Sequence, residues 1–267
     1  MRLPATLVRA LAGALFGVAI AAGAALAQTP FFVTGTYVIT LRGVNVAEAE
    51  IGFSDDGDTY RVAVNGNVAG VATLVARGTA SLSSAGRSGA DGLLSDSFSL
   101  TTRTEFENFY LGYEARGGRV TSEMINPPLP PDAERVPLTA AHRRGINDPI
   151  AAFLLRAGGL EPEACNRTLR VFTGIERYDM DLAFLEQQEA TSQRTGYQGP
   201  VMLCSIRYRP ISGHFVNSPS TEYLAQSDRF LIWYAPLGTT GFLFPYRMIM
   251  GTAYGDLSMI LTHLTGI

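Results

Sequence analysis

The stretch YVITLRGVNVAEAEIGFSDDGDTYRVAV, residues 37–64, decides the fold class. It contains three runs in which apolar residues alternate with small, polar or charged residues. Gly43 separates the first run from the second, and the cluster 55–58 (Asp-Asp-Gly-Asp) separates the second from the third. Alternation with a period of two, interrupted by Gly- and Asp-containing turns, is typical of consecutive β-strands. The opening of the chain therefore predicts antiparallel hairpins.

The same pattern continues outward from this stretch. Residues 68–82 are ambiguous between a strand and a short helical piece, and residues 84–91 have the small, polar composition of a loop. Residues 97–106, 109–114 and 119–125 predict a three-stranded meander. Further strands are predicted over 167–172, 175–185, 201–210, 230–235, 246–254 and 257–264. A polar loop is expected over 187–199, and the last two strands are expected to form a hairpin about Gly255-Asp256.

The centre of the sequence has a different character. Four prolines within residues 126–132 remove backbone donors, so this segment should cross the molecule in an extended conformation. Asp148 as N-cap, Pro149 as first helical residue and Gly158 as stop then predict one short helix. Its apolar residues recur at helical spacing and predict one buried face.

These elements predict a mainly β protein, with a curved antiparallel sheet or an incompletely closed β-barrel around one short central helix. A sheet of so many strands must protect its edge strands from pairing with other chains, which favours a curved or partly closed sheet. Residues 28–267 are long enough for a single mainly-β domain with one core.

Residues 1–27 have the pattern of a signal peptide. Arg2 and Arg9 precede an uncharged apolar run that ends in Ala25-Leu26-Ala27, a small-x-small cleavage site. We therefore expect an exported, periplasmic protein that begins near Gln28 and has no transmembrane segment in its mature part.

The charge composition excludes several classes of function. The whole chain has a net charge of −3 and contains no Lys. A mildly acidic chain offers no electrostatic attraction for nucleic acid. Without Lys, the chain cannot form a P-loop, a Schiff base or a Ser-Lys dyad. The absence of Lys is itself typical of a GC-rich genome.

The two cysteines, Cys165 and Cys204, predict a disulfide, because an even number of Cys in an oxidising compartment usually pairs. Free thiols or a metal site are the alternatives. The three histidines are scattered, so zinc-ligand spacing is absent, and the sequence predicts neither a metal site nor a cofactor.

The densest polar cluster lies on two of the predicted strands. Alternation places Arg177, Asp179 and Asp181 on one face of the first strand, and Arg207 and Arg209 on one face of the second. If these strands are neighbours, carboxylates face guanidinium groups across the sheet. We interpret the cluster as a structural charged face; an anion site built from Arg is the alternative. An acid/base pair is disfavoured because the Arg side chains would lower the pKa of both carboxyls.

Two aromatic-rich segments near the C-terminus are candidates for ligand binding. Such rings are usually core, but some line the mouth of a β-barrel. The candidate ligand-binding residues are Phe230, Trp233, Tyr234, Phe242, Phe244 and Tyr246. No Gly-x-Ser-x-Gly elbow is present, so no catalytic residue is predicted. His142 and Arg143 precede the predicted helix, and His214 and His263 have no partner in sequence.

Several segments together resemble a known family. These are Pro137–Leu154, Cys165–Asp179, Tyr197–Pro200, Cys204–His214 and Trp233–Leu237, with the Tyr37–Phe53 pattern at the start. They are similar to the exported proteobacterial family of domain of unknown function 3108. Thr173 departs from the Asp expected in its turn. The resemblance implies a mainly β periplasmic protein without an established activity.

These observations favour a non-enzymatic periplasmic protein of the cell envelope. It would bind a hydrophobic or amphiphilic ligand, such as a lipid or lipoprotein, or an envelope protein. Two alternatives remain. One is a hydrolase of cell-wall or lipid substrates that uses His142 or His214 with the Arg/Asp cluster, and the other is a purely structural assembly factor.

Overall fold

The computed structural model describes residues 29–74, 76–130 and 134–266. The predicted signal peptide, residues 1–27, lies outside the described residues. Among the described residues, no helix is long and apolar enough to cross a membrane.

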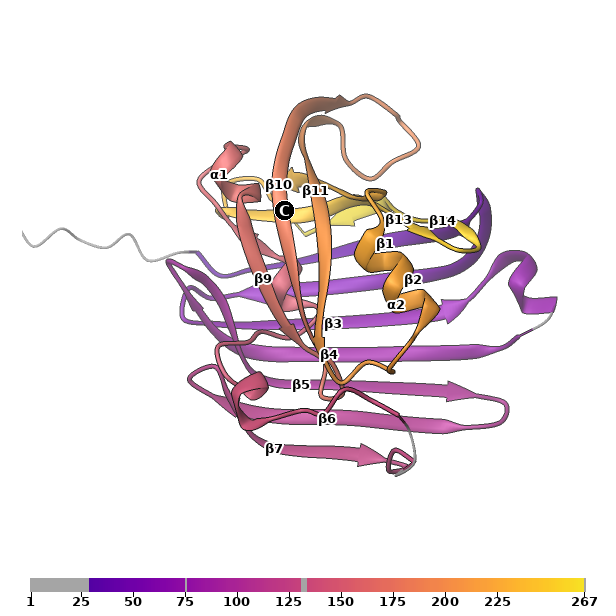
Figure 1. Ribbon diagram of the computed structural model, residues 1–267. Coiled ribbons are helices and arrows are strands. Elements are labelled where there is room, and N and C mark those ends of the chain that lie inside the picture. Colours follow the sequence, from indigo (N-terminus) through magenta and orange to yellow (C-terminus); the bar gives the residue numbers. More distant parts are fainter. Residues whose placement is uncertain (1–28, 75, 131–133, 267) are drawn as a thin grey trace, which may run out of the picture.

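A large antiparallel sheet makes up most of the described chain, as Figure 1 shows. The first half supplies the seven strands β1 (Phe31–Leu41), β2 (Val44–Asp55), β3 (Thr59–Val68), β4 (Gly78–Gly89), β5 (Gly92–Thr104), β6 (Asn108–Arg116) and β7 (Arg119–Asn126). The second half supplies β8 (Leu155–Arg156), β9 (Arg167–Phe172), β10 (Arg177–Ala190), β11 (Gly199–Ser212), β12 (Phe230–Pro236), β13 (Phe242–Thr252) and β14 (Gly255–Thr265). The prediction of a mainly β, antiparallel fold is confirmed.

The strand order shows how the two halves of the sheet are joined. Strands β7 to β1 follow one another in reverse order, then β14 pairs with β1, and the order continues through β13, β12, β11 and β10 to β9. In Figure 1, β9, β10 and β11 run steeply across the first strands of the chain and end near β4, so the second half of the sheet folds across the first. The two edge strands, β7 and β9, do not pair with each other, and the barrel is therefore incompletely closed.

The segment 144–147 links the two edges of the sheet. Arg144 forms a bridge to Arg119 on β7, and Asn147 forms a parallel bridge to Val171 on β9. The side chain of Asn147 also reaches β5, where its Nδ2 donates to the carbonyl of Leu93 over 2.9 Å. This segment satisfies edge groups that would otherwise be unpaired.

The prediction of an α-helix over Asp148–Gly158 is wrong. The structure forms only a 3-10 turn, η3 (Ala151–Phe153), followed at once by β8, in which Arg156 pairs with Phe242 on β13. The segment lies inside the fold: Leu154 packs in the cluster with β1 to β3, and Leu155 packs in the cluster with β9 to β12. Because both sides of the segment are buried, a single apolar helical stripe could not fill this space.

Asp148 nevertheless holds the backbone just before η3, although the N-cap residue of η3 is Ile150. Its Oδ1 accepts hydrogen bonds from the backbone N–H groups of Ile150 and Ala151, both over 2.8 Å. Its Oδ2 accepts from the Ser84 hydroxyl over 2.5 Å, and the Tyr60 hydroxyl lies 3.4 Å away. The Asp148 side chain is fully buried, and burial raises its pKa.

Other local predictions need correction. Residues 84–91 belong mostly to β4 rather than to a loop, because Ser84 is buried and finds its partners in Tyr60 and Asp148. The ambiguous stretch 68–82 contains the 3-10 turn η1 (Gly70–Leu74) before β4 begins. Strand β10 extends to Ala190, into the predicted loop 187–199, and the final turn lies at residues 253–254.

Three further helical pieces lie between strands: η2 (Ala140–Arg143), α1 (Pro162–Cys165) and α2 (Pro219–Gln226). Helix α2 begins at Pro219 and is capped by Ser218, whose Oγ accepts from the Thr221 N–H over 3.3 Å. Its Leu224 and Ala225 pack on the cluster of β9 to β12.

The predicted disulfide is present between Cys165 and Cys204. It joins α1 to β11, and both residues are fully buried. The bond therefore fastens the segment before edge strand β9 to the centre of the second half of the sheet.

Candidate functional site

The structure brings the predicted polar cluster together on β9, β10 and β11. Asp179 faces Arg209 and Asp181 faces Arg207 across the β10–β11 pair, as the alternation predicted. Arg209 binds Asp181 with two nitrogens, over 2.5 and 3.0 Å, and Asp179 over 3.2 Å. Arg177 contacts Asp179 from the other side over 2.5 Å.

The electrostatics of this cluster favour the ionised form of Asp181. The hydrogen bond from Arg209 holds the pKa of Asp181 below its usual range, and a further bond from the Thr168 hydroxyl, over 2.6 Å, acts in the same direction. The contacts of Asp179 and Asp181 are with Arg and Thr rather than with a histidine. A carboxylate held ionised in this way is a poor general acid near neutral pH. In the observed register of β10 and β11, Asp179 and Asp181 lie directly opposite Arg209 and Arg207.

The six predicted ligand-binding residues lie mostly in the core. Phe230, Tyr234, Phe242, Phe244 and Tyr246 are all buried. Trp233 is partly buried; its Nε1 donates to Gln188 Oε1 over 2.8 Å, and the Arg247 guanidinium lies 5.2 Å from its ring centre. The barrel interior next to these rings is occupied by residues 146–157. Ligand binding by these six residues remains a prediction, and in this structure five of them serve in packing.

The predicted histidines are separated in the fold. His142 lies in η2, where its Nδ1 accepts from the Thr139 N–H over 3.2 Å. His214 follows β11, its backbone carbonyl accepting from the Val136 N–H over 2.9 Å, and His263 lies on β14. Among the described residues, no group of His, Cys, Asp and Glu has the arrangement of a metal site.

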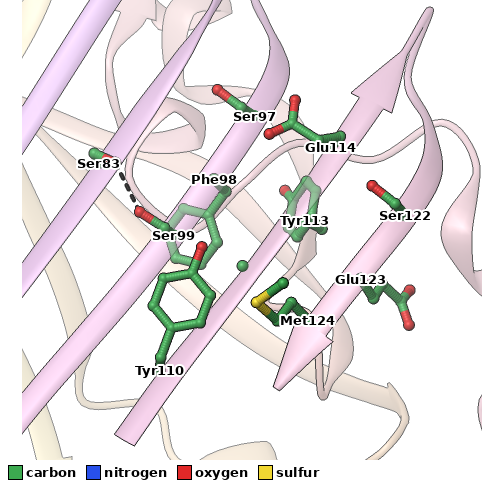
Figure 2. Close-up of a pocket in the computed structure, with 11 residues that line it drawn as sticks. Ser83, Ser97, Phe98, Ser99, Tyr110, Tyr113, Glu114, Ser122, Glu123 and Met124 are labelled. Atoms are coloured by element: carbon green, nitrogen blue, oxygen red, sulfur yellow. Dashed lines mark hydrogen bonds between the residues drawn. The ribbon is translucent and has the colours of Figure 1, made fainter. Parts of the chain in front are cut away.

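One surface hollow is lined by polar and apolar groups in similar measure. Figure 2 shows the hollow over β4 to β7, where the Ser83 and Ser99 hydroxyls are 2.8 Å apart. Glu114 and Ser122 line the same hollow, and the Tyr110 ring reaches across Gly112, where an added Cβ would meet the Tyr110 hydroxyl at 2.5 Å. Hydroxyls and carboxylates at this position do not suit a hydrocarbon chain.

A second pocket, of about 300 Å³, is apolar and lies at the end of the sheet where α2 meets the β13–β14 turn. We call it the α2 pocket. It is lined by Leu41, Ser220, Tyr223, Leu224, Thr252, Ala253, Tyr254 and Leu257. Its chemistry is dominated by aliphatic and aromatic side chains, with hydroxyls only at Ser220, Thr252 and the two Tyr.

Local sequence explains the walls of the α2 pocket. Helix α2 forms one wall because Ser218 and Pro219 begin it beside β11 and β13. The turn at residues 253–254 forms the other wall; Thr252 braces it, since its hydroxyl donates to the Gly255 carbonyl over 2.7 Å and accepts from the Tyr254 N–H. Arg42, from the β1–β2 turn, donates from Nε to the Tyr254 carbonyl over 2.5 Å.

The sequence prediction missed the α2 pocket. The signal Ser218-Pro219-x-x-Glu222 is a helix start that the sequence carries openly. However, Leu41 and Leu257 come from opposite ends of the chain, and only the β1–β14 pairing places them side by side.

Comparison with known proteins identifies the family. The model for the family described as protein of unknown function DUF3108 matches residues 36–262. The chain belongs to this family. This DUF3108 chain has no match among curated proteins.

A solved structure shares the fold of this DUF3108 chain. It is a β-barrel-like protein of domain of unknown function DUF1849 from Brucella abortus, with a TM-score of 0.50 and 12% sequence identity. The match covers 89% of this chain and 98% of the other. At this identity the likeness concerns the fold alone.

Proposed function

We propose that this protein is an exported, periplasmic and non-enzymatic component of the cell envelope that binds an amphiphile. The bound group would be a hydrocarbon chain of a lipid or of a lipoprotein, taken into the α2 pocket. The apolar lining of that pocket is the observation that carries the proposal. The N-terminal signal-peptide pattern and the buried disulfide support export.

The pocket has the size and chemistry for part of a hydrocarbon chain. Its volume of about 300 Å³ is at the lower end of the range of small-molecule sites. Leu41, Leu224 and Leu257 supply aliphatic contacts, and Tyr223 and Tyr254 offer aromatic faces. Removing a chain of methylene groups from water at this site gives a favourable free energy of about 0.8 kcal/mol for each buried CH₂.

A cation lies beside the pocket and supports an anionic or zwitterionic head group. The Arg42 side chain bonds to Tyr254, which lines the pocket, and packs against Gly255. Guanidinium groups bind carboxylate and phosphate oxygens well because their N–H groups form a planar fork. An amphiphile would thus place its chain between α2 and the hairpin and its head group near Arg42.

No observation favours the hydrolase alternative over this proposal. Asp179 and Asp181 are engaged by Arg177, Arg209 and Thr168, and the histidines lie on other elements. The α2 pocket contains no carboxylate or histidine in its lining. A purely structural role differs from the proposal because it requires no ligand in this pocket.

A blocking substitution tests the proposal. Ala253 is exposed and lines the pocket, so Ala253→Phe should fill the pocket without disturbing the core. The matched control is Ala90→Phe in the exposed β4–β5 turn, away from the pocket. Calorimetry with monomeric lysophosphatidylglycerol should detect binding by the wild type and by Ala90→Phe, and a loss of binding in Ala253→Phe. Equal affinity in all three proteins would contradict the proposal.

Export is tested separately. Intact-mass measurement of protein recovered from the periplasm, without reduction, should give a chain that begins near Gln28 and lacks two hydrogens because of the disulfide. A protein that stays in the cytosol with its full N-terminus would contradict the periplasmic assignment.

A further inference from the structure

Exposed apolar side chains gather on the turns at one end of the sheet. Because the strands of the first half alternate in direction, the turns 42–43, 70–74 and 105–107 lie at the same end, with the exposed side chain of Val44 directly after the first. The β13–β14 turn joins them, since Leu41 pairs with Leu257 and the Arg42 N–H donates to the Asp256 carbonyl. These turns lie together on the right of Figure 1.

Three of these turns carry large side chains that are almost fully exposed. Phe106 is 95% exposed, Leu74 is 85% exposed and Tyr254 is 73% exposed. Val71 and Tyr223 are also exposed at this end. We call the set Val44, Val71, Leu74, Phe106, Tyr223 and Tyr254 the apolar rim.

The opposite end of the sheet has different chemistry. Its turns contain Asp56-Gly57-Asp58, Ala90-Asp91 and Gly117-Gly118. In the turns 56–58, 90–91 and 117–118 no large apolar side chain is exposed. Exposed apolar residues scattered singly are ordinary, but a concentration on the turn tips of one end indicates an interaction surface.

The spacing of the rim residues favours a partner with a flat surface. Neighbouring strands are about 4.8 Å apart, so successive hairpin tips on the same end are separated by about 10 Å. Tips 253–254, 42–44, 70–74 and 105–107 therefore form a row about 30 Å long. The α2 pocket lies at one end of this row, where the tip 253–254 lines it. An apolar slab can contact every tip in such a row, whereas a single peptide side chain reaches one.

The charges at this end are mixed. Arg77 pairs with Glu105 over 3.8 Å, and Arg229 forms an ion pair with Asp256. Paired charges of both signs contribute little attraction for an anionic surface, so the apolar side chains must supply the affinity.

We propose that the apolar rim docks this protein onto the surface of a lipid bilayer. The tips of Leu74 and Phe106 insert into the boundary between head groups and acyl chains, and the α2 pocket then opens at the level from which a lipid chain can enter it. This inference deepens the proposed function, on which it rests. It adds a bilayer as the partner and assigns the docking to residues outside the pocket.

The test compares rim and non-rim variants of the exported protein in vesicle flotation. The rim variant is Leu74→Ser combined with Phe106→Ser. The matched control is Leu185→Ser combined with Phe32→Ser, because Phe32 and Leu185 are also exposed but lie on β1 and β10, away from the rim turns. All proteins carry the same N-terminus, so any difference comes from the substitutions. Since the four side chains are exposed, neither variant should lose its fold.

We expect the wild type and the control to float with vesicles of phosphatidylethanolamine and phosphatidylglycerol, and with vesicles of phosphatidylcholine. The rim variant should bind at least about tenfold more weakly to both, since each inserted side chain contributes on the scale of one factor of ten. Equal flotation of rim variant and control would overturn the proposal.

Two other outcomes would each refute docking onto a bilayer. If the wild type binds monomeric lysophosphatidylglycerol but does not float with vesicles, docking is refuted while the proposed pocket function stands. If the wild type is a dimer by light scattering and the rim variant is a monomer, a second copy of the chain occupies the rim, and the bilayer assignment is wrong.

Discussion

Substitution of Asp148 gives the sharpest test of how the interior is held together. Asp148 is a fully buried carboxyl group that accepts from the Ile150 and Ala151 N–H groups at the start of η3 and from the Ser84 hydroxyl. Two variants separate these roles. Asp148→Asn keeps one side-chain oxygen to accept from Ile150 and Ala151, whereas Asp148→Ala removes every acceptor.

The expected cost of Asp148→Ala follows from the groups that it leaves unpaired. Each buried donor left without a partner costs about 1–3 kcal/mol, and here the Ile150 and Ala151 N–H groups both lose their acceptor. We therefore expect Asp148→Ala to lower the free energy of unfolding by about 2–6 kcal/mol, which is the sum for these two donors. Asp148→Asn should cost clearly less, about 1 kcal/mol at acidic pH, because its amide keeps an acceptor for them.

The pH dependence of the two proteins should differ in a defined direction. Burial raises the pKa of Asp148 in the folded state, so the folded protein holds this proton more tightly than the unfolded chain does. The stabilisation from the protonated carboxyl is present below the unfolded pKa of about 3.9. It is lost as the pH rises through the folded pKa, with a slope of at most about 1.4 kcal/mol per pH unit. The amide introduced by Asp148→Asn does not titrate, so the difference between this variant and the wild type should shift in favour of the variant as the pH rises.

Urea unfolding without reduction, repeated from pH 4 to pH 7, measures both effects. Other titrating groups are common to both proteins and cancel in the difference when they lie apart from residue 148. A difference between Asp148→Asn and wild type that stays constant with pH would refute the raised pKa. An Asp148→Ala variant as stable as Asp148→Asn would refute the argument from the two unpaired donors.

Three further predictions concern other parts of the fold. Replacing Cys165 and Cys204 together by Ala should lower the free energy of unfolding by about 4 kcal/mol, because the disulfide closes a loop with a sequence separation of 39. Thermal unfolding of the wild type with and without reductant measures the same effect. Equal melting temperatures for the oxidised and the reduced wild type would contradict it. Arg209→Gln should lower the free energy of unfolding by less than about 1 kcal/mol, since the Arg209 side chain is 47% exposed. Arg209 lowers the pKa of Asp181, so the wild type loses stability when acid protonates Asp181, and the variant should lose less. A cost that is independent of both salt and pH would argue against the ion pair. Gly213→Ala should destabilise the protein by more than about 2 kcal/mol, because Gly213 has φ +86° and an added Cβ would lie 2.0 Å from the Ile175 carbonyl oxygen. Gly43→Ala, at φ +79° with open space around the position, should cost only about 1 kcal/mol. Chemical denaturation compares the two variants, and similar costs would show that the close approach to Ile175 does not destabilise Gly213→Ala.

The strands could be predicted from the sequence because their signals are local. In residues 37–64 the apolar residues alternate and the turns contain Gly and Asp, so hydrophobic burial and turn geometry agree on the same hairpins. The pairing of Asp179 with Arg209 followed from alternation once β10 and β11 were neighbours. The disulfide followed from having only two cysteines in a chain with the pattern of an exported protein.

The central segment shows where local signals failed. Asp148 and Pro149 start a turn as predicted, but Arg156 then pairs with Phe242, which lies far along the chain. Burial of both sides of residues 146–157 and a strand partner on β13 outweighed helix propensity. Likewise, residues 84–91 have the composition of a loop, but most of them belong to β4, where the buried Ser84 hydroxyl bonds to Tyr60 and Asp148.

The sequence by itself determined the strand-rich class, the antiparallel hairpins, the charged faces of β10 and β11, and the expectation that the two cysteines pair, because each depends on residues close in sequence or few in number. Only the tertiary structure decided that the barrel interior is filled by its own chain, that five of the six predicted aromatic ligand residues are buried, and that the α2 pocket and the apolar rim exist. The physical reason is that alternating strand directions collect residues 44, 74, 106 and 254 at one end of the sheet. The turn at residues 253–254 joins the others only through the pairing of β1 with β14, and no period in the sequence records that pairing.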